Sequence, residues 1–238
     1  MLLPLPTSHT PYRTREAQLG TTSKSAPQPT SESVTTLILV IYCHPDGTSF
    51  ASILHATVVT SLKKAGHTVT DLDLYNDGFR PVMTLQERSD YDNPGLYHKT
   101  VEKYANQLEA AEAIVAVYPT WWYGLPAMLK GYFDRVWAPG VAFDIGSGGK
   151  FETDRLKQIR KLGVVTTYGS TWWLIRLYMG DPERKLWGRA IRKLCGKRCT
   201  LDWHVHYDMD HATPARPERF RKQFHRFTPR SYAHRLDY

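Results

Sequence analysis

The sequence predicts an α/β protein in which a doubly wound, five-stranded parallel sheet carries helices on both faces. Residues 36–42, 113–118 and 161–167 are unbroken runs of mostly β-branched and aliphatic residues, typical of strands buried on both faces. Two shorter strands are expected at 68–74 and 200–207. Amphipathic helical segments separate these strands, and such alternation requires right-handed crossovers and a parallel sheet.

The first strand leads through a tight turn at 43–47 into a helix that ends near residue 65. Thr48 or Ser49 can cap its first turn, and Gly66 suits the residue that follows its last turn. Three apolar residues recur at helical spacing on one face, namely Leu54, Val58 and Leu62. The opening unit is therefore a strand, a short loop and a helix.

Three more helices are expected between the later strands, and a further helix is expected at the end. They span 97–110, 125–137, and a segment starting at Pro182, for which Asp181 is a start signal. A closing helix is expected from about residue 215. The apolar stripes of the last three comprise Leu125, Leu129, Tyr132 and Val136; Trp187, Ile191 and Leu194; and Phe220, Phe224 and Phe227.

The ends of the chain differ in composition from the middle. Residues 1–33 are rich in Ser, Thr and Pro and hold few large apolar side chains, so we expect them to be disordered. A transit peptide is the alternative, and Glu16 and Glu32 argue against it. We expect one doubly wound α/β domain at 34–228 and a tail at 229–238.

Charge is distributed unevenly along the 238 residues. Lys and Arg number 31 against 23 Asp and Glu, and the whole excess of +8 falls in residues 176–238, which hold 15 basic and 7 acidic residues. This pattern does not predict a nucleic-acid-binding coat. A solvated helix face is the expected explanation, and a docking surface for the 2′-phosphate of NADPH or for an acidic partner is the alternative. The outward positions on the closing helix are Arg216, Arg219, Arg221, Lys222 and Arg226.

The three cysteines, Cys43, Cys195 and Cys199, are too few for a disulfide framework. An odd number fits a reducing compartment, so a cytoplasmic location and structural thiols are expected. No apolar run reaches the roughly 18 residues of a membrane span. We expect no integral membrane segment and no nucleic-acid partner.

Ligands of open α/β sheets bind beyond the carboxyl ends of the strands, so the loops after the strands are the places to examine. After the first strand, His44, Thr48 and Ser49 precede Phe50 at a helix N-terminus, where backbone N–H groups and the helix dipole favour an anion such as phosphate. The loop lacks the glycines and lysine of the common nucleotide motifs.

The loop after the third strand is aromatic. It comprises Pro119, Thr120, Trp121, Trp122, Tyr123 and Gly124. Such a loop can hold a large flat ring system, and a plain core or dimer patch is the alternative reading. The loop after the fourth strand starts with Thr166, Thr167, Tyr168 and Gly169. A phosphate site beside a planar-ring site indicates a flavin nucleotide.

These motifs resemble the flavodoxin-like NAD(P)H:quinone oxidoreductase family, which includes ancillary proteins of potassium efflux. The matching stretches lie at 44–50, 73–81, 118–140 and 166–167. The resemblance implies strand order 2-1-3-4-5, FAD or alternatively FMN as cofactor, NAD(P)H as co-substrate, and a homodimer with sites at the interface. It also implies ping-pong hydride transfer to a quinone or similar flat electrophile.

Carried over by position, the resemblance places the flavin phosphate near His44, Thr48, Ser49 and Phe50, and the isoalloxazine ring along 119–123. Residues 166–169 would face the pyrimidine edge, where donors stabilise charge that develops on reduction. The family follows this loop with a Tyr and a His-Gly-Asp, and the corresponding motif here is Met179-Gly-Asp181, which lacks the His. Tyr168 and Tyr178 are the remaining catalytic candidates.

The missing His leaves a second hypothesis, a flavin-binding regulatory or ancillary subunit with little turnover. A one-electron carrier is a third, although that role goes with an acidic docking face. His204, His206 and His211 with Asp208 and Asp210 suggest a metal site only weakly, and none is expected. The Gly-rich loop 138–150 is either a lid or an ordinary surface loop.

Overall fold

The fold is described by a computed structural model, which covers residues 35–146, 151–152, 155–211 and 219–220. The described residues all belong to one compact unit, Ser33–Tyr238. The expected disorder of residues 1–33, the tail at 229–238 and most of the closing helix lie outside the described residues. Of that helix only Arg219 and Phe220 are described, and both are helical.

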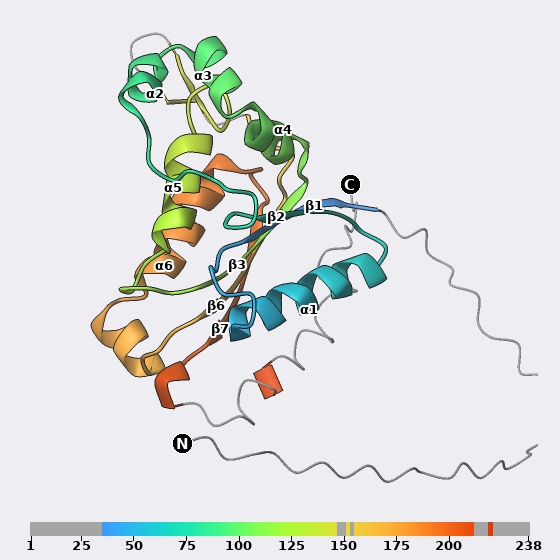
Figure 1. The fold of residues 1–238 in the computed structure, drawn as a ribbon, viewed down its shortest axis with the longest axis vertical. Coiled ribbons are helices and arrows are strands. Elements are labelled where there is room, and N and C mark those ends of the chain that lie inside the picture. Colours follow the sequence, from blue (N-terminus) through green and yellow to red (C-terminus); the bar gives the residue numbers. More distant parts are fainter. Residues whose placement is uncertain (1–34, 147–150, 153–154, 212–218, 221–238) are drawn as a thin grey trace, which may run out of the picture. The chain divides into compact units, whose positions relative to one another are not determined.

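The central sheet has five parallel strands in the order β2-β1-β3-β6-β7 (Figure 1). Their bounds are β1 Leu37–Tyr42, β2 Thr68–Asp73, β3 Ala113–Pro119, β6 Lys161–Thr167 and β7 Thr200–His206. Numbered within the sheet, this is the order 2-1-3-4-5, so the predicted fold class and strand order are confirmed. The order reverses between β1 and β3, which places a switch point at their carboxyl ends.

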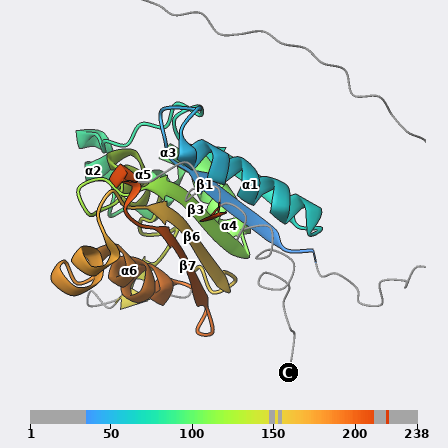
Figure 2. The same cartoon turned by 90° about the horizontal axis from the view of Figure 1, so that it is seen from below.

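Alternate residues of each strand face opposite layers of helices. Ile38 and Val40 of β1 pack with α1 (Phe50–Lys64), whereas Leu39 and Ile41 face the larger core on the other side. That second core also contains residues of α3 (Pro94–Thr100), α4 (Glu102–Ala110) and α5 (Ala127–Val136). Figures 1 and 2 show α1 on one side of the sheet and α4, α5 and α6 on the other.

Helix α1 begins and ends where the sequence indicates. The Ser49 side chain accepts a hydrogen bond from Ser52 N at 3.2 Å, which satisfies one of the free N–H groups of the first turn. Gly66 has φ +87°, a left-handed conformation that glycine adopts without strain. The predicted stripe of Leu54, Val58 and Leu62 is buried.

Two parts of the helical prediction were incomplete. The expected helix at 97–110 is two helices, α3 and α4, which meet at Val101 (φ −116°, ψ 16°). A further helix, α2 (Leu85–Asp90), was missed although Thr84 and Glu87 form a reciprocal capping box at its start. A short hairpin of β4 (Asp144–Ile145) and β5 (Phe151–Glu152) was also missed, because two-residue strands leave no periodic pattern.

The helical segment at 182–194 changes its winding along its length. It starts as α6 (Pro182–Lys185), continues as the more widely wound π-helix η3 (Leu186–Ile191) and ends as the tighter 3-10 helix η4 (Arg192–Leu194). The buried residues of this segment are Glu183, Trp187, Ile191 and then Cys195, and Leu194, the last member of the expected stripe, is half-buried and packs against the same core. Another π-helical turn, η2, covers Leu174–Tyr178. Within the described residues, no helix has the length and apolar character needed to cross a membrane.

Candidate functional site

A cavity of about 750 Å³ lies at the carboxyl ends of β3 and β6. Its walls come from the loop after β3, the loop after β6 and the turn after β7. The lining residues are Pro119, Thr120, Trp121, Trp122, Tyr123, Thr167, Tyr168, Gly169, Ser170, Met209 and Asp210. Eight of these eleven were predicted from the sequence as cofactor-binding residues, so the structure brings the second and third loops together around one hollow.

The aromatic loop turns back on itself as a tight hairpin. Trp121 and Gly124 exchange two backbone hydrogen bonds, each of 3.1 Å, and the two residues between them have positive φ, 51° at Trp122 and 60° at Tyr123. This conformation costs roughly 1 to 2 kcal/mol for each residue other than glycine. Trp122 is 97% exposed, so little packing offsets that cost. Strain of this kind is concentrated at functional sites.

Comparing two replacements of Trp122 distinguishes the effect of its strained backbone on stability from the effect of losing its indole ring. Both Trp122→Gly and Trp122→Ala remove the exposed indole, but only glycine relieves the positive φ. We expect the Gly variant to have a free energy of unfolding about 1 kcal/mol higher than the Ala variant. Urea denaturation of both proteins measures the difference, and equal midpoints would show that the turn is unstrained.

A buried polar cluster lies behind the cavity wall, centred on the Glu183 carboxylate, which is 1% exposed. Its Oε2 accepts hydrogen bonds from Thr120 Oγ1 at 3.0 Å and Tyr168 Oη at 3.3 Å, both belonging to lining residues. Tyr118 Oη donates to the same oxygen at 3.4 Å and accepts from Trp187 Nε1 at 2.8 Å. Glu183 is therefore connected to the cavity through its hydrogen bonds with the hydroxyl groups of Thr120 and Tyr168.

Burial sets the protonation of this cluster. Removal from water raises the pKa of Glu183 to about 7, although the hydrogen bonds from Thr120, Tyr168 and Tyr118 oppose the shift. Burial, followed by the nearby Glu183 carboxylate, also raises the pKa of the Tyr168 and Tyr118 phenols. The tyrosines therefore stay protonated as donors, while Glu183 changes charge near neutral pH.

Sequence reasoning missed Glu183, Ser170, Met209 and Asp210. Glu183 was not singled out from the sequence, because acidic side chains are common in the first turns of helices. The available signal was its spacing of four residues before Trp187, which places it on the buried stripe. The turn at Asp208–Asp210 had no signal beyond its position after β7.

The remaining predicted residues lie next to the cavity or outside it. Thr166 is fully buried, with its hydroxyl 3.0 Å from that of Thr120, and Gly124 closes the aromatic hairpin. The two catalytic candidates differ sharply. Tyr168 is buried and turned toward Glu183, whereas Tyr178 is 80% exposed and is not a lining residue of the cavity.

The first loop lies beside the aromatic loop, with the His44 ring centroid 5.9 Å from that of Trp121. Its own side chains already use several of its donors. Asp46 N donates to His44 Nδ1 at 3.0 Å, and Asp46 Oδ1 accepts from both the N–H and the hydroxyl of Thr48, each at 2.7 Å. The Thr48 hydrogen bonds lower the pKa of Asp46. The Asp46 carboxylate therefore already accepts from the N–H and hydroxyl groups of Thr48, which the sequence predicted as ligands of a phosphate.

The histidines near the end of β7 serve as packing and local hydrogen-bonding groups. The His206 ring packs edge-on against Phe220, with centroids 5.2 Å apart, and also contacts Phe50. His211 Nδ1 lies 2.9 Å from Asp208 Oδ1. Across the part of the chain that the structure describes, no group of three or more His, Cys, Asp or Glu side chains is placed to hold a metal ion.

The strand order, the switch point and the loops that enclose this cavity define a doubly wound α/β protein of the flavodoxin-like class. A family model described as the flavodoxin-like fold matches residues 36–196. The chain belongs to this family, as the sequence motifs indicated.

Several named relatives are oxidoreductases. The chain is 34% identical over 127 residues to the uncharacterized NAD(P)H oxidoreductase YcaK of Escherichia coli K12, a match covering 53% of this chain and 64% of that protein. It is 27% identical over 195 residues to NAD(P)H dehydrogenase (quinone) 1 of Rattus norvegicus, covering 74% and 70%. The chain thus spans somewhat under two thirds of the E. coli relative's length.

Solved structures show the same fold. Smu.1420 from Streptococcus mutans UA159 superposes with a TM-score of 0.68 and 26% identity, covering 81% of this chain and 98% of that one. An NAD(P)H:quinone oxidoreductase from Methanothermobacter marburgensis gives a TM-score of 0.73 at 23% identity, covering 83% and 99%. The second likeness supports the fold alone.

Proposed function

We propose that this protein is a flavin-dependent NAD(P)H oxidoreductase whose acceptor is a quinone or a similar flat electrophile. The observation that carries the proposal is the cavity at the carboxyl ends of β3 and β6, which is lined by an aromatic hairpin and by Thr120 and Tyr168, whose hydroxyl groups are anchored on Glu183. Membership of the flavodoxin-like family and oxidoreductases among the relatives support it.

The residues around the cavity fit a flavin ring. Trp121, Trp122 and Tyr123 offer flat apolar surface, and Thr167 and Gly169 bring backbone and hydroxyl groups to the opposite wall. A bound flavin would supply hydride transfer from NAD(P)H to the acceptor in two half-reactions, with FAD favoured over FMN by the family resemblance. The Tyr168 and Thr120 hydroxyl groups both donate to Glu183, so their orientation is set before any ligand arrives.

Asp46 is expected to weaken phosphate binding at the first loop, because its carboxylate occupies the Thr48 donors. Asp46→Asn keeps an oxygen acceptor for those donors and removes the negative charge. We expect the variant to bind flavin about 3- to 10-fold more tightly, as measured by quenching of flavin fluorescence. Asp92→Asn, which removes a charge from an exposed pair with Arg88, is the matched control and should leave affinity unchanged. Weaker binding by Asp46→Asn would show that Asp46 supports the site.

We also propose that the protein forms a homodimer. Apolar side chains are unusually exposed in two segments that neighbour the cavity, 121–122 and 172–179. The exposed residues are Trp121, Trp122, Trp172, Trp173, Leu177, Tyr178 and Met179. Contiguous apolar surface on a folded protein commonly marks an interaction site. Light scattering on the purified protein measures the mass directly, and a monomer at micromolar concentration would contradict this part of the proposal.

The deciding experiment is to purify the protein, release any chromophore by heat, identify it by mass, and then screen acceptors under NADH and NADPH. A yellow protein that oxidises either nucleotide with saturable dependence on a quinone supports the proposal. A protein that stays colourless after reconstitution with FAD and FMN and shows no turnover overturns it. Flavin binding without turnover would favour the ancillary-subunit hypothesis, and an accumulating one-electron-reduced flavin would favour the carrier.

A further inference from the structure

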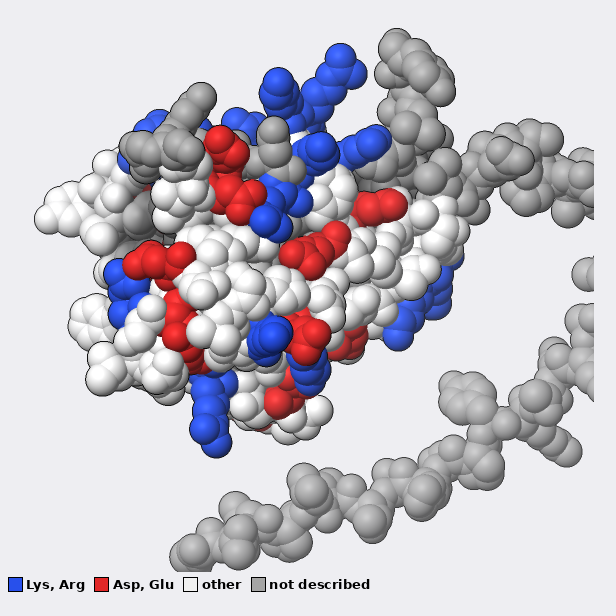
Figure 3. Space-filling view, turned by 90° about the horizontal axis from the view of Figure 1, so that it is seen from above, with Lys and Arg blue, Asp and Glu red and all other residues white. Residues whose placement is uncertain are grey.

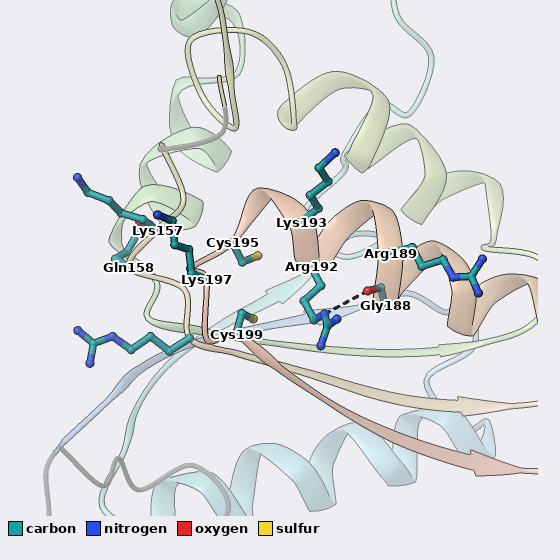
Figure 4. A pocket seen from close by; sticks show the side chains of 11 residues that line it. Lys157, Gln158, Gly188, Arg189, Arg192, Lys193, Cys195, Lys197 and Cys199 are labelled. Atoms are coloured by element: carbon teal, nitrogen blue, oxygen red, sulfur yellow. Dashed lines mark hydrogen bonds between the residues drawn. The ribbon is translucent and has the colours of Figure 1, made fainter. Parts of the chain in front are cut away.

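A second and larger hollow, of about 1040 Å³, lies at the opposite end of the strands, beside the amino ends of β6 and β7. Six of its lining residues are cations, Lys157, Arg160, Arg189, Arg192, Lys193 and Lys197, and none of the described residues that line it is acidic. Figure 4 shows Lys157 and Lys197 on one side, Arg192 and Lys193 on the other, and the Cys195 and Cys199 thiols between them.

None of the six cations forms an ion pair within the described part of the chain, whereas neighbouring Lys161 pairs with Asp202 at 2.8 Å. An adjoining hollow of about 500 Å³ shares Arg189 and Arg192 with the first and adds Arg184 and Lys185, and Asp181 is the one acidic side chain among its described lining residues. In Figure 3, Lys and Arg side chains gather at the upper edge, while charges of both signs mix over the rest of that face.

The backbone holds the cation-bearing segments in fixed positions. Gly196 N donates to Ile159 O at 3.0 Å, and Thr200 N donates to Arg160 O at 3.1 Å. The contact at Gly196 is so close that a Cβ there would lie 2.6 Å from Lys157 O. The loop before β6 and the turn before β7 are therefore held together, so the backbone positions from which Lys157, Arg160 and Lys197 extend are fixed relative to one another.

This arrangement is electrostatically unfavourable without an anion. Like charges around a concave surface repel one another, and the low-dielectric wall raises the potential inside. A solvated helix face, the expected explanation of the basic excess, would spread its cations over a convex surface. Residues 184–198 contain seven basic and no acidic residues. Four of these seven, Arg189, Arg192, Lys193 and Lys197, line the hollow.

The lining also limits the chemistry of the ligand. The described lining residues include no aromatic side chain, so they offer no platform on which a nucleobase could stack. Several lysines and arginines in one hollow suit a ligand with several phosphates, since guanidinium groups bind phosphate oxygens in pairs and lysines add point charges. This hollow lies at the amino ends of the strands, whereas the cavity described above lies at the carboxyl ends of β3 and β6.

We propose that this basic hollow, lined by residues 157–160 and 188–199, is a binding site for a small polyphosphorylated molecule. The proposal does not depend on the flavin chemistry, because it uses different residues at the other end of the strands. Binding would be driven by charge and would therefore weaken as salt is added.

The test is calorimetric titration of the full-length protein with tripolyphosphate at low ionic strength. We expect saturable binding with near-unit stoichiometry, and an increase in the dissociation constant of about 10-fold or more in the double variant Arg192→Ala/Lys197→Ala. The matched control is Lys63→Ala/Lys64→Ala, which removes two exposed cations from the last turn of α1 and should bind like the wild type. Thermal denaturation of each variant without ligand checks that it is folded.

Three results would overturn the proposal. Equal losses in the two double variants would show general charge attraction instead of a site. Orthophosphate binding as tightly as tripolyphosphate would remove the requirement for several phosphates. A short DNA duplex or an acidic peptide that displaces tripolyphosphate at lower concentration would identify a macromolecular surface.

Discussion

Glu183→Gln is expected to abolish a pH dependence of stability that the wild-type protein shows between about pH 4.5 and 7. Burial raises the pKa of Glu183 from 4.5 to about 7 in the folded state. The folded protein therefore holds this proton more tightly than the unfolded chain does, so ionisation destabilises the fold as pH rises. The wild type should lose up to about 3 kcal/mol over this range, and the loss should stop above the folded pKa.

Glutamine imitates the protonated acid because it is neutral and keeps an oxygen that can accept from Thr120 and Tyr168. The variant should match the wild type at pH 4.5 and exceed it at pH 8 by up to about 3 kcal/mol. Urea denaturation at a series of pH values measures both curves. Glu102→Gln, at an exposed position in the first turn of α4, is the control and should follow the wild-type curve. Parallel curves for wild type and Glu183→Gln would show that Glu183 stays ionised throughout.

Gly131→Ala is expected to lower the free energy of unfolding by about 3 kcal/mol, an effect of overpacking. Gly131 lies in α5 directly against the loop that follows β2. A Cβ at this position would lie 2.3 Å from Pro81 O and 2.5 Å from Pro81 Cα, both backbone atoms, so helix and loop would have to separate. The same helix carries Arg135, which pairs with Glu87, so the shift would disturb that buried ion pair as well.

Gly188→Ala is the matched comparison for this prediction, because Gly188 is also helical. A Cβ there would meet only Leu201 Cδ2, at 3.6 Å, which is an ordinary contact. We expect this variant to be as stable as the wild type or more stable by about 0.5 to 1 kcal/mol, because alanine loses less backbone entropy in a helix. Thermal unfolding of both variants measures whether each is more or less stable than the wild type. A Gly131→Ala variant as stable as the wild type would show that the contact with Pro81 rearranges at little cost.

The sheet could be predicted from the sequence because its strands are buried on both faces and read as continuous apolar runs. Five strands and their order agree with expectation, and Ser49 and Gly66 mark the ends of α1 through local chemistry alone. The same local reasoning could not find the break at Val101, since both α3 and α4 bury the same core and the apolar spacing continues across it.

For the candidate site, the aromatic loop and the start of the loop after β6 were predicted because they follow strands directly. Glu183 was not, because its importance arises from tertiary contacts with side chains 15 to 65 positions away in the chain. The conflict at Asp46 was also invisible, since a carboxylate two residues before Thr48 is an ordinary turn residue until its hydrogen bonds are seen.

The change of winding along residues 182–194 has a geometric consequence. In an α-helix, positions four apart differ by about 40° around the axis, so repeated steps of four drift away from the buried face. In the π-helical turn η3 each residue rotates less, which offsets this drift between Trp187 and Ile191. Glu183, Trp187, Ile191 and Cys195 are all buried, so one segment contributes both the carboxylate behind the aromatic cavity and a thiol that lines the basic hollow.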